Sequence, residues 1–218
     1  MSLVLPRLYP ITDTIISCLS HAEQVERLAA GGATLIQLRE KLATPREFYE
    51  AARRAVSVAR TLGVQIVIND RADIAIAVKA DGVHLGQTDL PPARARSLLG
   101  PSRILGYSTH TLEQALEATM APVDYIAVGP VFGTRTKQNP DAMVGLEMIK
   151  LVRAQVSRPL VAIGGITLDS ARAVLDAGAD SVAVIWDLLS TADIAERTRS
   201  FIYELEVTDG ESIAGPRS

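Results

Sequence analysis

The chain has 218 residues, 48% of them hydrophobic, which is enough for one well-buried core, and we expect a single domain. Its 22 Lys and Arg residues and 25 Asp and Glu residues give a net charge of −3, so no overall field draws the protein to nucleic acid or to an anionic membrane. Cys18 is the only cysteine, which excludes an intrachain disulfide and favours a cytoplasmic location.

Short runs of β-branched and aliphatic residues recur along the chain and predict strands separated by amphipathic segments. The strands are expected at residues 8–12, 34–38, 65–68, 82–85, 104–107, 125–131, 160–163 and 181–185. In the clearest amphipathic segment, apolar side chains recur every three or four residues from Phe48 to Ala59. Thr44 and Pro45 are typical of a helix start and Gly63 of a helix end, so we predict a helix between them.

The alternation of strands and helices predicts repeated β-α units around a parallel sheet. The strands at residues 160–163 and 181–185 are continuously apolar, as expected in a covered parallel sheet. A chain of about two hundred residues with that many units favours an α/β fold, a single (β/α)8 TIM barrel with parallel strands. An open doubly wound sheet is the second choice.

We expect the barrel domain to occupy residues 1–204 and the polar tail at residues 205–218 to be poorly ordered. The N-terminus lacks the basic start and longer apolar stretch of a signal peptide. No run approaches the roughly 18 consecutive apolar residues of a spanning helix. The sequence therefore predicts a soluble protein.

Polar motifs follow several of the predicted strands, and in barrel enzymes the chemistry lies at the carboxyl ends of the strands. After the second strand, alternation places Gln37, Arg39 and Lys41 on one face. An arginine fork and a mobile lysine charge suit a monophosphate or diphosphate. The segment is equally compatible with a solvated strand end in which Glu40 and Lys41 form a surface pair.

Two carboxylates follow neighbouring strands, Asp70 after the third and Asp89 after the fourth. A turn or a helix cap explains either one alone. As a pair they also suit Mg²⁺, which prefers oxygen ligands and shares its shell with water and substrate phosphate. The sequence contains no histidine cluster for zinc.

His84 lies within the fourth strand, and we expect it to point into the barrel with a buried, hydrogen-bonded role and a secondary contact to substrate. Ser108 ends the fifth strand and is left to donate to a phosphate if a following threonine caps the next helix. No histidine–carboxylate pattern makes it a nucleophile. His21 and His110 lie at helix starts and receive no catalytic role.

Two further loops have compositions that suit an anion. The loop at residues 129–140 is rich in hydroxyls and amides and contains the cations Arg135 and Lys137. Gly164 and Gly165 follow the seventh strand, where barrels commonly bind phosphate through backbone N–H groups. Glycine lets the backbone approach a ligand closely, and a tight turn explains one of the pair better than both.

Taken together, these motifs resemble, in order, those of the thiamine phosphate synthase family over about residues 7–190. They lie at residues 9–13 (YPITD), 37–41 (QLREK), 69–70 (ND), 82–89 (GVHLGQTD), 129–137 (GPVFGTRTK) and 162–166 (AIGGI). The resemblance implies a (β/α)8 enzyme that condenses 4-amino-2-methyl-5-(diphosphooxymethyl)pyrimidine with 4-methyl-5-(2-phosphoethyl)thiazole. Pyrophosphate would leave with the help of Mg²⁺, and the thiazole nitrogen would attack the pyrimidinylmethyl cation to give thiamine phosphate.

The resemblance also implies roles for particular residues. The pyrimidine diphosphate would be held by Gln37, Leu38, Arg39, Glu40, Lys41 and Asn69, with Lys137 and Ser108 on its phosphates. Arg39, Lys41, Lys137 and Ser108 would act on the departing group, and Asp70 and Asp89 would bind Mg²⁺. The thiazole phosphate would be received by Thr134, Arg135, Thr136, Gly165 and the backbone of Ile185 and Trp186. Trp186 stands where family members often carry serine, so a hydroxyl contact to that phosphate is absent.

Two other functions compete with the synthase. The sister family of thiazole tautomerases is similar in sequence, but its members carry a histidine base where this chain has Pro130. A non-catalytic module for thiazole or thiamine phosphates would tolerate the loss of the diphosphate and metal groups, which are all present. We therefore expect two small-molecule substrates and no nucleic-acid or membrane partner. The sequence is compatible with a monomer or a homo-oligomer.

Overall fold

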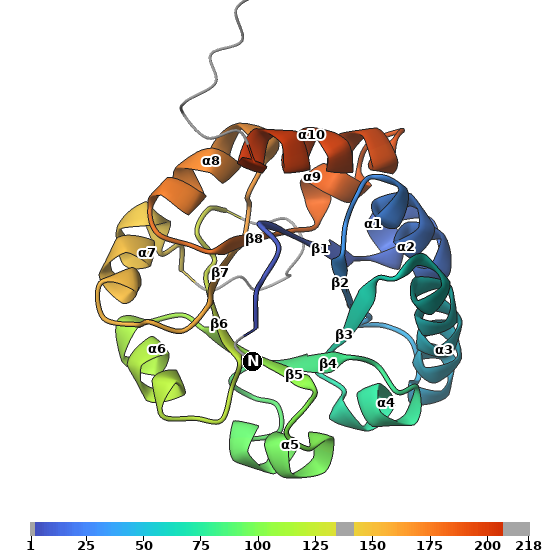
Figure 1. Ribbon diagram of the computed structural model, residues 1–218, viewed down its shortest axis with the longest axis horizontal. Helices are drawn as coiled ribbons and strands as arrows, with labels where there is room; N and C mark the ends of the chain where they lie inside the picture. Colours follow the sequence, from blue (N-terminus) through green and yellow to red (C-terminus); the bar gives the residue numbers. More distant parts are fainter. Residues whose placement is uncertain (1–2, 134–141, 207–218) are drawn as a thin grey trace, which may run out of the picture.

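The strands of this protein close into a barrel, in which each strand pairs in parallel with the next along the chain and the last pairs with the first. They are β1 Leu8–Thr12, β2 Leu35–Leu38, β3 Gln65–Asn69, β4 Gly82–Leu85, β5 Ile104–Thr109, β6 Tyr125–Val128, β7 Leu160–Ile163 and β8 Ser181–Val184. The computed structural model describes residues 3–133 and 142–206 (Figure 1). The predicted (β/α)8 barrel is confirmed, and the open sheet is wrong.

Two strand ends differ from the prediction by more than one residue, and both lie beside the site. β5 extends to Thr109 because Ser108 and Thr109 pair with Ala127 and Val128 of β6. Ser108 therefore lies within a strand. β6 ends at Val128, before the predicted end at residue 131, since Pro130 has no N–H with which to continue the ladder.

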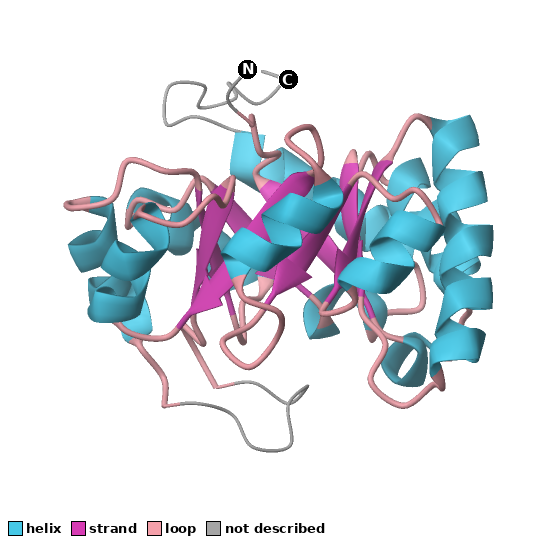
Figure 2. Ribbon diagram, turned by 90° about the horizontal axis from the view of Figure 1, so that it is seen from below, coloured by secondary structure: helices cyan, strands magenta, loops and turns pink. Residues whose placement is uncertain are grey.

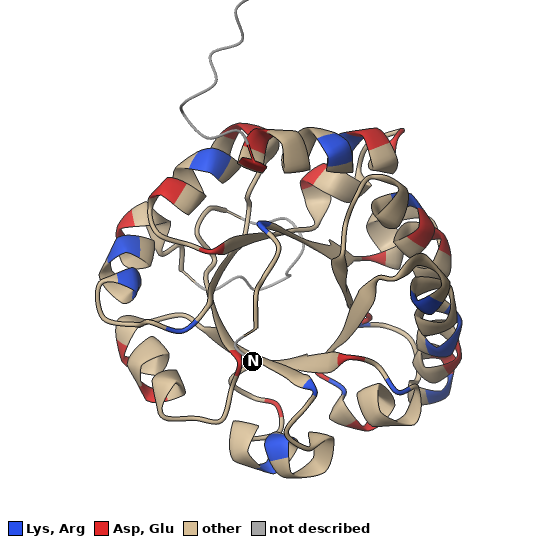
Figure 3. Ribbon diagram, in the orientation of Figure 1, with Lys and Arg blue, Asp and Glu red and all other residues tan. Residues whose placement is uncertain are grey.

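Strand alternation divides the apolar side chains into two layers. The inner layer fills the barrel and contains Tyr9, Ile11, Leu35, Val67, Ile104, Tyr125, Ala127, Val161 and Ala183. The outer layer packs between strands and helices and includes Ile36 and Leu38. None of the residues of these eight strands is charged, and Figure 3 shows the charged residues mostly on the surrounding helices and loops.

The helices lie outside the strands and cover the barrel wall (Figure 2). They are α1 Thr14–Ser17, α2 His21–Ala30, α3 Pro45–Leu62, α4 Ala72–Ala77, α5 Pro92–Leu99, α6 Leu112–Thr119, α7 Gly145–Arg153, α8 Leu168–Asp176, α9 Trp186–Leu189 and α10 Ile194–Glu206. Within the described ranges, none of them combines the length and the apolarity that a bilayer crossing requires.

The local helix signals act where the sequence places them. Thr44 and Glu47 form a reciprocal capping box at the start of α3, Pro45 occupies its first turn, and Gly63 ends it with a φ of 70°. At the other end of the chain, α10 continues to Glu206 and buries Leu205. The domain boundary predicted at residue 204 therefore falls inside this helix.

Gly106 in β5 makes room for the ring of Tyr125 inside the barrel. A methyl group at Gly106 would lie 2.1 Å from Cζ and 2.3 Å from the hydroxyl oxygen of that ring. Tyr125 is fully buried and packs edge-on against Tyr9, so it has no space into which to move.

We predict that Gly106→Ala lowers the free energy of unfolding by about 1–3 kcal/mol, because the added methyl overpacks the inner layer. Urea denaturation would measure the change. Gly133→Ala is a matched control, since the nearest atom to its added methyl is the Met143 sulfur at 3.7 Å. Equal stability of the two variants would show that Tyr125 does not confine position 106.

Candidate active site

A cavity of about 930 Å³ opens at the carboxyl ends of the strands, and residues at or after every strand line it. The predicted site residues among its lining are Gln37, Arg39, Lys41, Asn69, Asp70, Asp89, Ser108, Gly165, Ile185 and Trp186. Thr134, Arg135, Thr136 and Lys137 lie outside the described residues. Side chains that are far apart in the sequence thus meet in one cavity, as expected when parallel strands share an edge.

Lys41, Asp70 and Asp89 form the most charged part of the cavity. The Lys41 ammonium lies 2.5 Å from Oδ2 of Asp70. Asp70 adopts a left-handed φ of 62° directly after β3, and its N–H donates to the carbonyl of His84 at 2.8 Å. Arg71, and not Asp70, is the cap residue of α4, so the capping explanation for Asp70 is wrong. The Asp70 carboxylate instead pairs with Lys41.

Asp89 is anchored to its own turn and faces Asp70. Its Oδ2 accepts a hydrogen bond from the N–H of Gly86 at 2.7 Å. Burial raises the pKa of Asp89, and the neighbouring carboxylate of Asp70 raises it further. Two carboxylates held this close to each other favour a cation between them.

The carboxylate pair fits a magnesium ion better than a metal held by protein ligands alone. Among the residues that the structure describes, no group of three or more His, Cys, Asp and Glu side chains could hold a metal. Mg²⁺ commonly takes one or two carboxylates and completes its shell with water and substrate phosphate. Asp70 and Asp89 could supply those carboxylates at the cavity wall.

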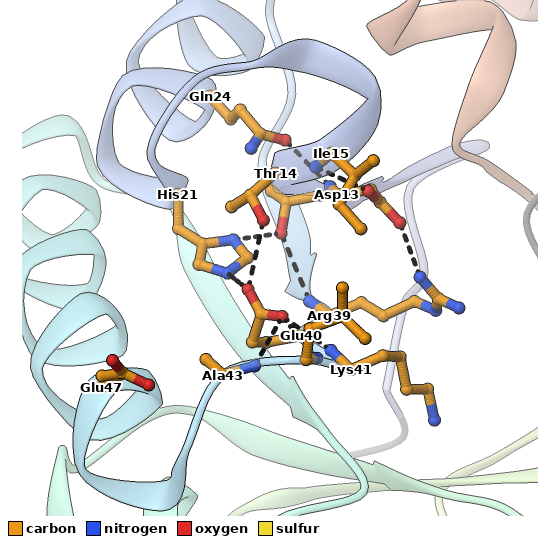
Figure 4. A network of polar contacts seen from close by, with 12 residues as sticks. Asp13, Thr14, Ile15, His21, Gln24, Arg39, Glu40, Lys41, Ala43 and Glu47 are labelled. Carbon is orange, nitrogen blue, oxygen red and sulfur yellow. Dashed lines mark hydrogen bonds and ion pairs between the residues drawn. The ribbon is translucent and has the colours of Figure 1, made fainter.

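Asp13 holds the guanidinium of Arg39, as Figure 4 shows. The Arg39 Nη1 atom donates to Oδ2 of Asp13 at 2.6 Å. The other oxygen of Asp13 accepts the N–H groups of Ile15 and Ile16 at the start of α1, so the carboxylate is fixed by the backbone. Asp13 was not among the predicted site residues, although it directly follows a strand, which is the signal that identified Asp70.

Glu40 shapes the turn that carries Lys41. Its carboxylate accepts the N–H groups of Lys41, Leu42 and Ala43 and the hydroxyl of Thr14, and it lies 3.6 Å from the imidazole of His21 (Figure 4). The alternative prediction of a surface pair between Glu40 and Lys41 is therefore wrong, because Lys41 pairs with Asp70. Glu40 and Leu38 do not line the cavity, and Leu38 is buried against the helices. Their predicted substrate contacts remain untested.

His84 and Ser108 lie side by side on β4 and β5. The Nε2 atom of His84 is 2.8 Å from the hydroxyl oxygen of Ser108, and its Nδ1 atom is 2.9 Å from that of Tyr125. Burial lowers the pKa of His84 to about 4, so the imidazole is neutral near pH 7. The buried, hydrogen-bonded histidine is confirmed. Thr111 caps α6, as expected, and Ser108 lines the cavity.

The glycines after β7 are both required by the structure. Gly164 and Gly165 have φ values of 104° and 63°, and a methyl group on either would lie within 2.5 Å of Pro130 or the carbonyl of Gly133. Trp186 begins α9 and is 45% exposed at the cavity edge.

The cavity also contains residues to which the sequence analysis assigned no site role. They include Gln87, Thr88, His110, Gln114 and Thr167. The Nδ1 atom of His110 lies 2.6 Å from the carbonyl oxygen of Gly129, where β6 ends. Its position after β5, immediately past the strand end, is the signal that could have found it.

Comparisons with known proteins agree over nearly the whole chain. The sequence profile described as thiamine monophosphate synthase matches residues 8–188. The thiamine-phosphate synthase of Koribacter versatilis is 47% identical over 207 residues, which are 92% of this chain and 96% of that protein. The thiamine-phosphate synthase of Chloroflexus aurantiacus is 42% identical over 208 residues, which are 95% of this chain and 96% of that protein.

One solved structure is similar to this chain in both sequence and fold, and another is similar in fold alone. Thiamine phosphate pyrophosphorylase from Pyrococcus furiosus superposes with a TM-score of 0.83 at 38% identity, covering 92% of this chain and 96% of that one. A 3-hexulose-6-phosphate synthase has a TM-score of 0.67 at 17% identity, with coverages of 91% and 99%. The second likeness shows the barrel fold alone.

The buried histidines make stability depend on pH. Burial lowers the pKa of His84 from 6.5 to about 4 and lowers that of His21 as well. Between pH 6.5 and about pH 4, His84 binds a proton in the unfolded chain but not in the folded chain, so the free energy of unfolding falls as the pH falls through this window. The loss is at most about 1.4 kcal/mol per pH unit for each histidine.

We therefore predict that acidification from about pH 7 to about pH 5 destabilises the protein, and that His84→Gln reduces this loss. Urea unfolding at both pH values would measure it. The same acid loss in the variant and the parent would mean that His84 does not bind fewer protons in the folded state.

Proposed function

We propose, because the chain belongs to the thiamine monophosphate synthase family, that it is a transferase that joins a pyrimidine diphosphate to a thiazole phosphate. The products are thiamine phosphate and pyrophosphate. The observation that carries the proposal is the meeting of Arg39, Lys41, Asp70, Asp89 and Ser108 in one cavity. Cations, a metal-compatible carboxylate pair and a hydroxyl are the groups that a departing diphosphate needs.

The chemistry requires stabilisation of a leaving group more than a nucleophile from the protein. When pyrophosphate departs from the pyrimidinylmethyl carbon, negative charge grows on its oxygens and the electron-rich ring stabilises the cation left behind. Arg39, fixed by Asp13, and Lys41, carried by the turn around Glu40, present positive charge to those oxygens without reorganisation. Ser108 adds a hydroxyl donor from β5.

We assign Asp70 and Asp89 as the ligands of Mg²⁺. The ion, when bound, would neutralise charge on the diphosphate as a Lewis acid. Bound by both carboxylates, it would offset the repulsion between them, and Lys41 is a second cation beside Asp70.

The opposite side of the cavity suits the thiazole phosphate. Gly165 and the backbone of Ile185 and Trp186 line it, and Thr134, Arg135 and Thr136 remain proposed partners from outside the described residues. Holding the thiazole nitrogen against the pyrimidinylmethyl carbon turns a bimolecular step into one within a complex. Trp186 brings an indole in place of a serine hydroxyl, so phosphate recognition there would rely on backbone N–H groups.

The competing functions have less support. The chain has Pro130, and no histidine, at the position of the tautomerase base, and its relatives are named as synthases. A binding module would have no need of the Lys41, Asp70 and Asp89 cluster. A cytoplasmic location remains a prediction, and both a monomer and a homo-oligomer remain compatible with the sequence.

We predict that the purified protein, given both substrates and Mg²⁺, makes thiamine phosphate and pyrophosphate in equal amounts. Mass spectrometry would identify the joined product, and a coupled assay would measure pyrophosphate. Isomerisation of a thiazole precursor alone would favour the tautomerase instead. Binding of the thiazole phosphate without any joined product would favour the binding module.

We also predict that Asp89→Asn raises the Mg²⁺ concentration needed for half-maximal turnover at least about 10-fold, because the amide loses the ligand charge. The amide oxygen can still accept the N–H of Gly86, so folding is retained. Asp73→Asn is the matched control, because Asp73 pairs with Arg71 and does not line the cavity. The same dependence of turnover on Mg²⁺ concentration in the parent and in Asp89→Asn would refute the metal assignment.

A further inference from the structure

Five polar side chains form a continuous hydrogen-bonded chain across the inside of the barrel. Gln37 Nε2 lies 3.2 Å from the Tyr9 hydroxyl, which lies 3.1 Å from the Tyr125 hydroxyl. Tyr125 contacts Nδ1 of His84 at 2.9 Å, and Nε2 of His84 contacts Ser108 at 2.8 Å. Gln37, His84 and Ser108 line the cavity, whereas the two tyrosines are buried and do not. We call this series the tyrosine–histidine chain.

Packing holds the middle of the tyrosine–histidine chain in place. The Tyr9 and Tyr125 rings meet edge-on with centroids 6.0 Å apart. The His84 imidazole stacks on Tyr125 at 5.5 Å with an interplanar angle of 18°. Gly106 leaves the space that the Tyr125 ring fills. The hydroxyl groups therefore have fixed partners, and only the direction of their hydrogens remains to be determined.

The direction of these hydrogens follows from counting donors. Burial raises the pKa of Tyr9 to about 12 and that of Tyr125 well above its usual range, so each phenol keeps its single hydrogen. Tyr9 accepts from the amide of Gln37 and so donates to Tyr125. Tyr125 in turn donates to Nδ1 of His84. The imidazole hydrogen then resides on Nε2 and is donated to Ser108.

We infer that Tyr9, Tyr125 and His84 are positioning residues that direct the hydroxyl hydrogen of Ser108 into the cavity. Because Ser108 Oγ already accepts from His84, its own hydrogen is available to an anion. If His84 carried its hydrogen on Nδ1, Nε2 would instead accept the Ser108 hydrogen and withdraw it from the substrate. The inference rests on the proposed function, in which that anion is the departing diphosphate.

The tautomer of His84 is a direct test that requires no substrate. In protein labelled with ¹⁵N at histidine, the imidazole nitrogen shifts and couplings identify which nitrogen carries hydrogen, and a His84→Gln sample assigns the signal among the three histidines. We expect hydrogen on Nε2 in the parent protein. Hydrogen on Nδ1 alone would overturn the inference and leave the proposed function intact.

Tyr125→Phe removes only the hydroxyl that holds Nδ1 as an acceptor. We expect a decrease in kcat of between about 10- and 100-fold, since a donor to the leaving group is weakened, with the KM of both substrates changed less than about twofold. Tyr9→Phe breaks the chain one step earlier and should have a smaller effect. Tyr203→Phe, on the 60% exposed Tyr203, is the matched control and should leave turnover unchanged.

A double-mutant cycle separates positioning from a general loss of packing. If Tyr125 acts through Ser108, Tyr125→Phe has no further effect on kcat in a Ser108→Ala background. The inference would be overturned if the double variant lost kcat by the product of the two separate losses. A parent-like kcat in Tyr125→Phe would overturn it as well. Absence of turnover in the parent protein would instead refute the proposed function, and the histidine spectrum would still report on the tautomer.

Discussion

Closure of the parallel sheet is the constraint on which the rest of this structure depends. Every strand runs in the same direction, so every carboxyl end reaches the same rim, and β8 closes on β1 without leaving an edge. The strands contain no charged residue, and the first polar side chains after them are therefore gathered around one cavity. Arg39 and Lys41 after β2, Asp70 after β3 and Asp89 after β4 meet there for this reason.

Around this rim, most charged side chains are held by a second polar group rather than by solvent. Asp13 fixes Arg39, Glu40 folds the turn that carries Lys41, and Asp70 receives the Lys41 ammonium. Such support matters because charge stabilisation of a leaving group is most effective when the protein dipoles need not reorganise. The left-handed backbone at Asp70 belongs to the same arrangement, since Asp70 pairs with Lys41 and does not cap α4.

The interior of the barrel links stability to the site. Tyr9 and Tyr125 belong to the apolar layer that fills the barrel, yet their hydroxyls lie between Gln37 and His84, which face the cavity. A buried polar network is favourable only when its members are satisfied, and each phenol here has two partners. The same side chains therefore fill the core and connect the two walls of the cavity. A distant barrel at 17% identity shares the architecture, and a shared fold does not by itself carry a function.

The sequence by itself determined the strands, the capped helix α3, the β-α alternation and the chemical groups at the strand ends. These features follow from periodicity and from short-range signals such as Thr44, Pro45 and Gly63, which act between neighbours in the chain. Only the tertiary structure decided which groups meet. Tyr9 and Tyr125 are 116 residues apart, Asp13 reaches Arg39 across adjoining strand ends, and Leu38 and Glu40 point away from the cavity despite their place in the motif. Such pairings depend on the closure of the whole barrel, and no local pattern contains that information.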